Sequence, residues 1–209
     1  MRWSEEETEA ITKMREILID DINSVDQNVE VVGDRCFIRF YRGHECDVDT
    51  ACEYMRNYLA WRKDNNVDKI RKNIVYDGYN DPTKFPHADV ILRIMPQTIC
   101  NTSMRDKHGR PLTIFRMNFS ISEFSENVTQ DQFVEFLIYV MEYHNVILEQ
   151  LAEEKEREIL ATAQTNGTPL TEPYGVVMSL CAVRDMQGLG LEHFGPYGFN
   201  LLRTVVCTS

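Results

Sequence analysis

The chain has 209 residues, a mass of 24.4 kDa and a formal net charge of −11 at pH 7. Phosphates repel such a charge, which excludes nucleic acid as a partner, and only a local basic patch could bind an anionic membrane. No run approaches the ~20 apolar residues that cross a bilayer. The acidic Glu5, Glu6 and Glu7 stand where a secretory signal would need apolar residues. We therefore expect a cytoplasmic protein whose six cysteines are free thiols.

The first third of the chain has helical spacing. Ser4 and Glu7 are placed for a capping box, Gly33 marks a break, and Asp47 or Asp49 can cap a later helix. Three successive helices each have a stripe of residues that we expect on the buried face. The first stripe is Ile11, Met14, Leu18 and Ile22, the second is Phe37, Phe40 and Tyr41, and the third is Ala51, Met55, Tyr58, Leu59 and Arg62. We expect a small helical domain at residues 1–80, joined to the rest by turn-forming residues at 77–88.

The second part of the chain alternates strand and helix signals. A turn at 107–111 precedes a buried strand at 112–117, and Thr129 with Gln132 forms a second capping box. The helix that follows has an apolar stripe and a charged, solvated end at 153–158, where Glu153 can pair with Arg157.

An apolar run at 176–183 fits a strand covered on both faces, and 191–206 fits a last helix. Strand, long helix and strand make a βαβ unit, so the fold class is α/β. Two strands make a poor sheet, with the second as an open edge, and residues 81–209 therefore read as half a domain.

Two segments resemble the CRAL-TRIO (Sec14-like) family. The first is Phe37-Ile-Arg-Phe-Tyr-Arg-Gly-His-Glu-Cys-Asp-Val-Asp-Thr-Ala51, followed by Asn57-Tyr-Leu-Ala-Trp-Arg62; it is similar to the family's N-terminal helical domain. The second runs from Asp106-Lys-His-Gly-Arg-Pro111 through Glu142 to Val183-Arg-Asp-Met-Gln-Gly188 and is similar to the front half of the lipid-binding domain. Together they cover roughly residues 30 to 205.

This resemblance implies a mixed sheet that floors a hydrophobic cavity closed by a helical gate. Family members extract one lipid from a membrane, shield it and deliver or present it; ligands include phosphatidylinositol, phosphatidylcholine, tocopherol and retinoids. The family's later strands, gate helix and most headgroup residues have no counterpart here, so we expect a lipid-binding domain whose C-terminal part is missing. Leu180 and Ala182 stand where the Sec14 subgroup has a serine and a threonine, which makes the floor more apolar.

Nine residues are the expected lining of the lipid pocket, because large pockets in α/β folds are mostly apolar. They come from the two strands and the long helix: Ile114, Phe115, Phe136, Val140, Tyr143, Ile147, Met178, Leu180 and Ala182. For each of them, simple core packing is the competing interpretation.

Other sites are weakly supported. His44, Cys46 and Cys52 offer only three metal ligands at irregular spacing, so no metal site is predicted. Gly188 and Gly190 begin a dinucleotide-like loop, but His193 stands where the third glycine would be. A basic cluster of Lys63, Lys69, Arg71 and Lys72 fits a solvated face or a membrane-docking patch.

The sequence thus predicts a lipid-binding and transfer protein that visits a membrane surface transiently. It predicts no enzyme activity, no catalytic residues and no cofactor. The alternative is an interaction module that binds a protein partner through the exposed sheet edge, or a fragment that has lost lipid binding.

Overall fold

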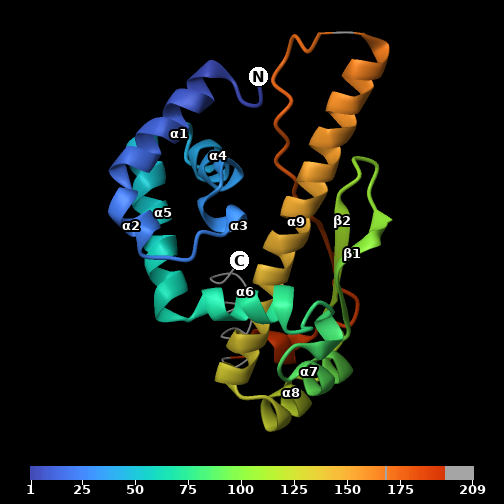
Figure 1. Ribbon diagram of the computed structural model, residues 1–209. Coiled ribbons are helices and arrows are strands. Elements are labelled where there is room, and N and C mark those ends of the chain that lie inside the picture. Colours follow the sequence, from blue (N-terminus) through green and yellow to red (C-terminus); the bar gives the residue numbers. More distant parts are fainter. Residues whose placement is uncertain (168, 196–209) are drawn as a thin grey trace. The chain divides into compact units, whose positions relative to one another are not determined.

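The computed structural model describes residues 1–167 and 169–195 (Figure 1). The chain forms two compact units, and each has residues from distant parts of the sequence. The first unit contains residues 1–68 and 148–178, and the second contains residues 69–147 and the segment from Ser179 onward. The units are defined by which residues pack together, whereas the predicted domains at 1–80 and 81–209 are continuous stretches of sequence. The two divisions are therefore different, and the domain boundaries stay a prediction.

Five helices build most of the first unit. They are α1 (Glu5–Ile17), α2 (Ile19–Asn23), α3 (Val29–Val32), α4 (Asp34–Gly43) and α5 (Val48–Asp64). The predicted capping box is confirmed: the Glu7 amide donates to Ser4 Oγ over 3.2 Å, and the Ser4 amide donates to Glu7 Oε2 over 3.1 Å. Of the two cap candidates for α5, the structure uses Asp47, whose side chain accepts from the Thr50 amide.

The predicted helical stripes form the core of the first unit. Met14, Leu18, Phe37 and Met55 have no exposed surface, and most of the other stripe residues are buried beside them. Arg62 is also buried, and its guanidinium reaches Asp68 Oδ1 over 2.6 Å. The side chains that the periodicity assigned to one face of each helix therefore meet in one core.

The remaining elements, apart from the long helix, belong mainly to the second unit. They are α6 (Val67–Tyr76), the short η1 (Pro82–Lys84), α7 (Ala88–Ile94), β1 (Gln97–Arg105), β2 (Pro111–Arg116), α8 (Ile121–Asn127), β3 (Cys181–Asp185) and η2 (Leu191–Phe194). The predicted linker at 77–88 contains η1, whose N-cap Asp81 accepts from the Thr83 amide.

The three strands form a mixed sheet in the order β1-β2-β3. The predicted turn at 107–111 closes an antiparallel β1–β2 hairpin, drawn in green in Figure 1, while β2 and β3 are parallel. The parallel pair confirms the βαβ prediction. Strand β1 was not predicted, because Gln97–Arg105 is mostly polar and buries only Ile99 and Cys100.

The long helix α9 (Gln130–Asn166) contributes to both units. Its predicted capping box forms, with the Gln132 amide donating to Thr129 Oγ1 and the Thr129 amide donating to Gln132 Oε1. The prediction of a solvated end at 153–158 is wrong at Glu156, which is only 7% exposed. Arg157 donates to the backbone carbonyl of Glu153 over 3.4 Å, so the predicted side-chain pair is replaced by a backbone contact.

The apolar run at 176–183 differs from its prediction. Only its end joins the sheet, as part of β3 at 181–185, and Val183 is 41% exposed, so a strand covered on both faces is wrong. Apolar composition alone did not distinguish a covered strand from one with an open face. Of the predicted helix at 191–206, residues 191–194 form η2, and 196–206 lie outside the described residues. None of the helices among the described residues has an apolar stretch that could cross a bilayer.

Candidate functional site

One face of the sheet contacts the long helix. Thr113 in β2 is buried, and its Oγ1 lies 3.4 Å from His144 Nε2 of α9 and accepts the Cys100 amide over 2.9 Å. Burial lowers the pKa of His144 to about 4, because the charged imidazolium would lose its hydration there. The imidazole is therefore neutral at physiological pH.

The opposite face of the sheet follows from the strand register. Residues on either side of Thr113 point away from α9, because successive side chains of a strand alternate between faces. Leu112 pairs with Cys181, and Ile114 pairs with Val183. We call these four residues the open sheet face: Leu112, Ile114 and Cys181 are half-buried and Val183 is exposed. It is an apolar surface on two parallel strands, and its thiol is its only titratable group.

The helix residues of the predicted lining are packed in the interior of the second unit. Phe136 and Val140 are buried. The Phe85 ring lies between predicted lining residues, with centroids 6.2 Å from Phe136 and 5.7 Å from Tyr143. Ile147 is half-buried near the end of this part of α9. This packing agrees with the alternative interpretation, in which these residues belong to the core and do not line a lipid pocket.

The strand residues of the predicted lining do not all share one face. Ile114 lies on the open sheet face, whereas its neighbour Phe115 faces the side of α9. Ala182 pairs with Thr113, so it too belongs to the α9 side, and it is exposed. Leu180 precedes β3 and is half-buried, and Met178 belongs to the first unit.

Sequence reasoning missed Cys181 and Val183 as neighbours of Ile114. The predicted lining took Met178, Leu180 and Ala182 as one face of the apolar run, whereas the residue that pairs with Ile114 is Val183. A strand register depends on its partner, and a shift by one residue exchanges the two faces.

A hydrogen bond to the Asp185 side chain closes the corner after β3. Asp185 Oδ1 accepts the Gln187 amide over 3.0 Å. Gly188 follows with a φ of +83°, and a side-chain carbon there would lie 2.6 Å from Asn118 Cβ. The glycine is thus required by both backbone conformation and space, which gives it a structural role.

A buried ionic cluster lies in the first unit and was not predicted. Arg35 of α4 is 2% exposed and forms ion pairs with Glu149 and, over 2.8 Å, with Glu156. Its Nε donates to the Val176 carbonyl, and Glu156 also accepts the Val176 amide. Burial raises the pKa of Glu149, while the adjacent Arg35 acts in the opposite direction. The cluster ties α4, the end of α9 and the segment at Val176 together.

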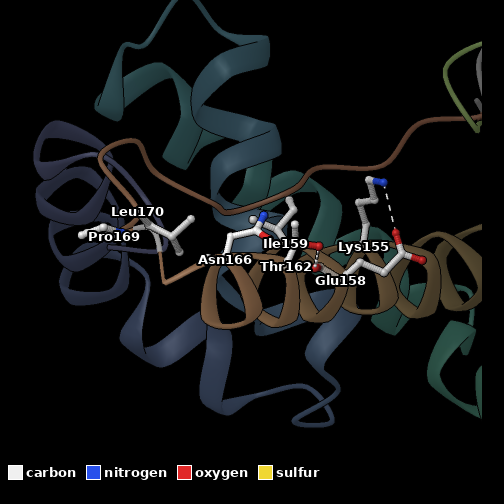
Figure 2. Close-up of a pocket in the computed structure, with 8 residues that line it drawn as sticks. Lys155, Glu158, Ile159, Thr162, Asn166, Pro169 and Leu170 are labelled. Atoms are coloured by element: carbon white, nitrogen blue, oxygen red, sulfur yellow. Dashed lines mark hydrogen bonds and ion pairs between the residues drawn. The ribbon is translucent and has the colours of Figure 1, made fainter.

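A pocket of about 420 Å³ lies at the end of α9 in the first unit (Figure 2). Figure 2 shows helix residues such as Ile159 and Thr162 opposite Pro169 and Leu170 of the following segment. The charges at its rim are paired, with Lys155 Nζ 3.1 Å from Glu158 Oε2. None of the nine predicted lining residues lines it.

His44, Cys46 and Cys52, the three possible metal ligands, lie in different environments. Cys52 is buried in the core of the first unit and Cys46 is exposed. The His44 ring stacks on Tyr54 with a centroid distance of 4.2 Å. Within residues 1–167 and 169–195, no group of three or more potential metal ligands comes together.

The chain is similar to several known proteins, two of which are named as phosphatidylinositol/phosphatidylcholine transfer proteins, although no protein-family model matches it. It is 24% identical to the phosphatidylinositol/phosphatidylcholine transfer protein SFH14 of Arabidopsis thaliana over 204 residues, 96% of this chain and 30% of that protein. It is 24% identical to the SEC14 cytosolic factor of Candida glabrata over 164 residues, 78% of this chain and 45% of that protein.

It is also 28% identical to the SEC14 cytosolic factor of Eremothecium gossypii over 110 residues, which are 52% of this chain and 32% of that protein. The chain thus spans less than half the length of each of these relatives. At this low identity, the similarities support the resemblance to the CRAL-TRIO (Sec14-like) family that the sequence motifs indicate.

Proposed function

We propose that the chain binds one small hydrophobic lipid on the open sheet face and transfers or presents it at membranes. The observation that carries the proposal is the apolar surface of Leu112, Ile114, Cys181 and Val183 on the side of the sheet away from α9. Its support comes from relatives that are named as phospholipid-transfer proteins.

The energetics of lipid binding fit such a surface. Removing an acyl chain from water gains about 0.8 kcal/mol per buried methylene, so a carrier requires apolar area and no catalytic group. The ligand in this proposal belongs to the phospholipid, phosphoinositide, tocopherol or retinoid class. The proposed setting is the cytoplasm, with transient contact to a membrane, and the protein acts as a carrier and not as an enzyme.

A second candidate function rests on the edge of the sheet. Among the described residues β3 has a strand neighbour only on the side of β2, and four of its five residues are exposed. An unpaired strand edge can accept a strand from another protein. This arrangement favours the interaction-module alternative if no lipid binds.

Native mass spectrometry after incubation with mixed-lipid vesicles tests the proposal. We expect a peak of protein plus one lipid, whose mass identifies the ligand. The key variant is Val183→Asp on the open sheet face, and its matched control is Val75→Asp on α6 in the second unit. The two valines are 41% and 39% exposed, so the two substitutions are matched in exposure and in the charge that they introduce.

Val183→Asp should raise the Kd for the lipid about tenfold in a lipid titration, because a carboxylate replaces a valine contact of roughly 1.5 kcal/mol. Val75→Asp should leave it unchanged. A folded wild-type chain without bound lipid, or equal losses in both variants, would contradict the proposed site. In the first case a protein partner at the β3 edge becomes the better account.

A further inference from the structure

The tip of the β1–β2 hairpin is a basic surface on an acidic protein. Residues 97–118 contain four arginines and lysines but a single acidic residue, Asp106, whereas the whole chain has a net charge of −11. Arg105, Lys107 and His108 are exposed at the turn, and Met104 beside them is 45% exposed. We call Met104, Arg105, Lys107 and His108 the hairpin tip.

The one acidic residue of the hairpin is used inside the turn. Asp106 Oδ2 accepts from Arg110 Nε over 2.7 Å, and its Oδ1 accepts the amides of His108 and Arg110, each over 2.9 Å. The hydrogen bond from Arg110 is the main cause that lowers the pKa of Asp106 to about 2. Asp106 is therefore compensated by Arg110 and does not neutralise the exposed cations.

The cations of the hairpin tip are held without a carboxylate. Arg105 Nε donates to the Thr102 carbonyl over 2.8 Å, and its second contact is the Gly109 carbonyl at 3.5 Å. Among the described residues neither Arg105 nor Lys107 has a carboxylate oxygen within 4.0 Å. Backbone contacts orient a guanidinium but leave its charge available for a phosphate or carboxylate outside the protein.

We infer that the hairpin tip docks on the anionic headgroups of a membrane. Basic side chains next to an apolar one suit the headgroup boundary, because the cations meet lipid phosphates and the methionine enters the apolar layer. The tip leads directly into β2, where Leu112 and Ile114 carry the open sheet face. Docking at the tip would thus bring the proposed lipid-binding face to the membrane, and in this respect the inference rests on the proposed function.

Sedimentation with vesicles tests the inference on the full chain. The vesicles are phosphatidylcholine alone, or phosphatidylcholine with phosphatidylserine as the anionic component. The test variant is Arg105→Glu with Lys107→Glu. The control is Lys63→Glu with Lys69→Glu, which changes the net charge equally in the other basic cluster of the chain, where both lysines are exposed.

Binding of the wild-type chain should require phosphatidylserine and weaken as salt rises. The hairpin variant should bind at least about thirtyfold more weakly, from the loss of two headgroup contacts, and the control should bind like the wild-type chain. Equal binding by the hairpin variant, equal losses in both variants, or binding independent of phosphatidylserine would overturn the inference; the first result would direct the search to an acidic protein partner.

Lipid capture in native mass spectra is measured separately for the same variants. Capture without charge-dependent docking would overturn this inference and leave the proposed function intact. Docking through the hairpin tip without lipid capture would support the membrane surface and reject the carrier function.

Discussion

The two compact units differ in how far they bury the apolar side chains of their main helices and strands. In the first unit, Met14, Phe37 and Met55 are fully buried in a core that includes most of the apolar helix stripes. In the second unit, β2 and β3 leave Ile114 half-buried and Val183 exposed on one side of the sheet. Helices that bury their stripes this fully are built for stability, whereas an open apolar sheet face is available for a ligand.

The units also differ in their buried polar groups. The first contains Arg35 with the carboxylates of Glu149 and Glu156. The second also buries Arg71 and Glu142, and it holds the half-buried, neutral imidazole of His144 next to the buried Thr113 hydroxyl. We expect the first unit to respond strongly to the loss of the Arg35 charge, and the second to respond to protonation of His144.

The largest effect is expected for Arg35→Ala, which leaves two buried carboxylates without their cation. The free energy of unfolding should fall by about 3–5 kcal/mol. The matched control is Arg56→Ala, because Arg56 pairs with Asp21 over 3.1 Å at the surface and is worth at most about 1 kcal/mol. Urea denaturation followed by tryptophan fluorescence measures both. A loss below about 1 kcal/mol for Arg35→Ala would mean that the cluster does not fasten the first unit.

The next effect concerns acid and the second unit. The folded pKa of His144 lies near 4, below the value of 6.5 in an unfolded chain, so the unfolded state takes up a proton first as the pH falls. The stability contribution is complete above pH 6.5 and decreases towards pH 4. Between pH 7 and 4.5 it should fall by roughly 2–3 kcal/mol.

His144→Gln isolates that pH dependence, since glutamine does not titrate. The drop between pH 7 and 4.5 should shrink by the same amount in this variant, as measured by urea denaturation at both pH values. An unchanged pH profile would show that His144 is hydrated in the folded chain.

A smaller effect compares the two capping boxes. Ser4→Ala in the first unit and Thr129→Ala in front of α9 should each cost about 1 kcal/mol, because each removes an acceptor for a first-turn amide. Thr165→Ala is the control, since its exposed hydroxyl only bonds back to the Ala161 carbonyl. Thermal unfolding by circular dichroism measures all three. If the control lost as much as the caps, the hydroxyls would not act through capping.

The features that the sequence predicted correctly are those that depend on residues close together in the chain. Ser4 with Glu7 and Thr129 with Gln132 fix helix starts through contacts three residues apart, so the spacing was sufficient. The burial of Glu156 was missed because its partner Arg35 comes from a distant helix, and nothing near Glu156 indicates that contact.

The strands show the same difference between contacts of neighbouring residues, which the sequence predicts, and contacts of distant residues, which it does not. Residues 97–105 have no apolar alternation and become β1 through pairing with β2, a contact that local propensity does not encode. For the candidate site, Ile114 is a predicted lining residue that lies on the open sheet face, and the predicted lining itself stays a prediction. Only the register with β2 shows that Cys181 and Val183, and not Ala182, share its face.

The most direct test of the account is the reactivity of Cys181 towards a thiol reagent, with and without lipid. Cys181 lies on the open sheet face, and the exposed Cys46 in the first unit is the internal reference. The chain is incubated with mixed-lipid vesicles, separated from them, labelled briefly and analysed by peptide mass spectrometry. We predict that lipid slows labelling of Cys181 at least about tenfold, as expected for a site occupied to nine-tenths or more, and leaves Cys46 unchanged. If bound lipid is detected while both cysteines label at their lipid-free rates, the lipid does not lie on the open sheet face.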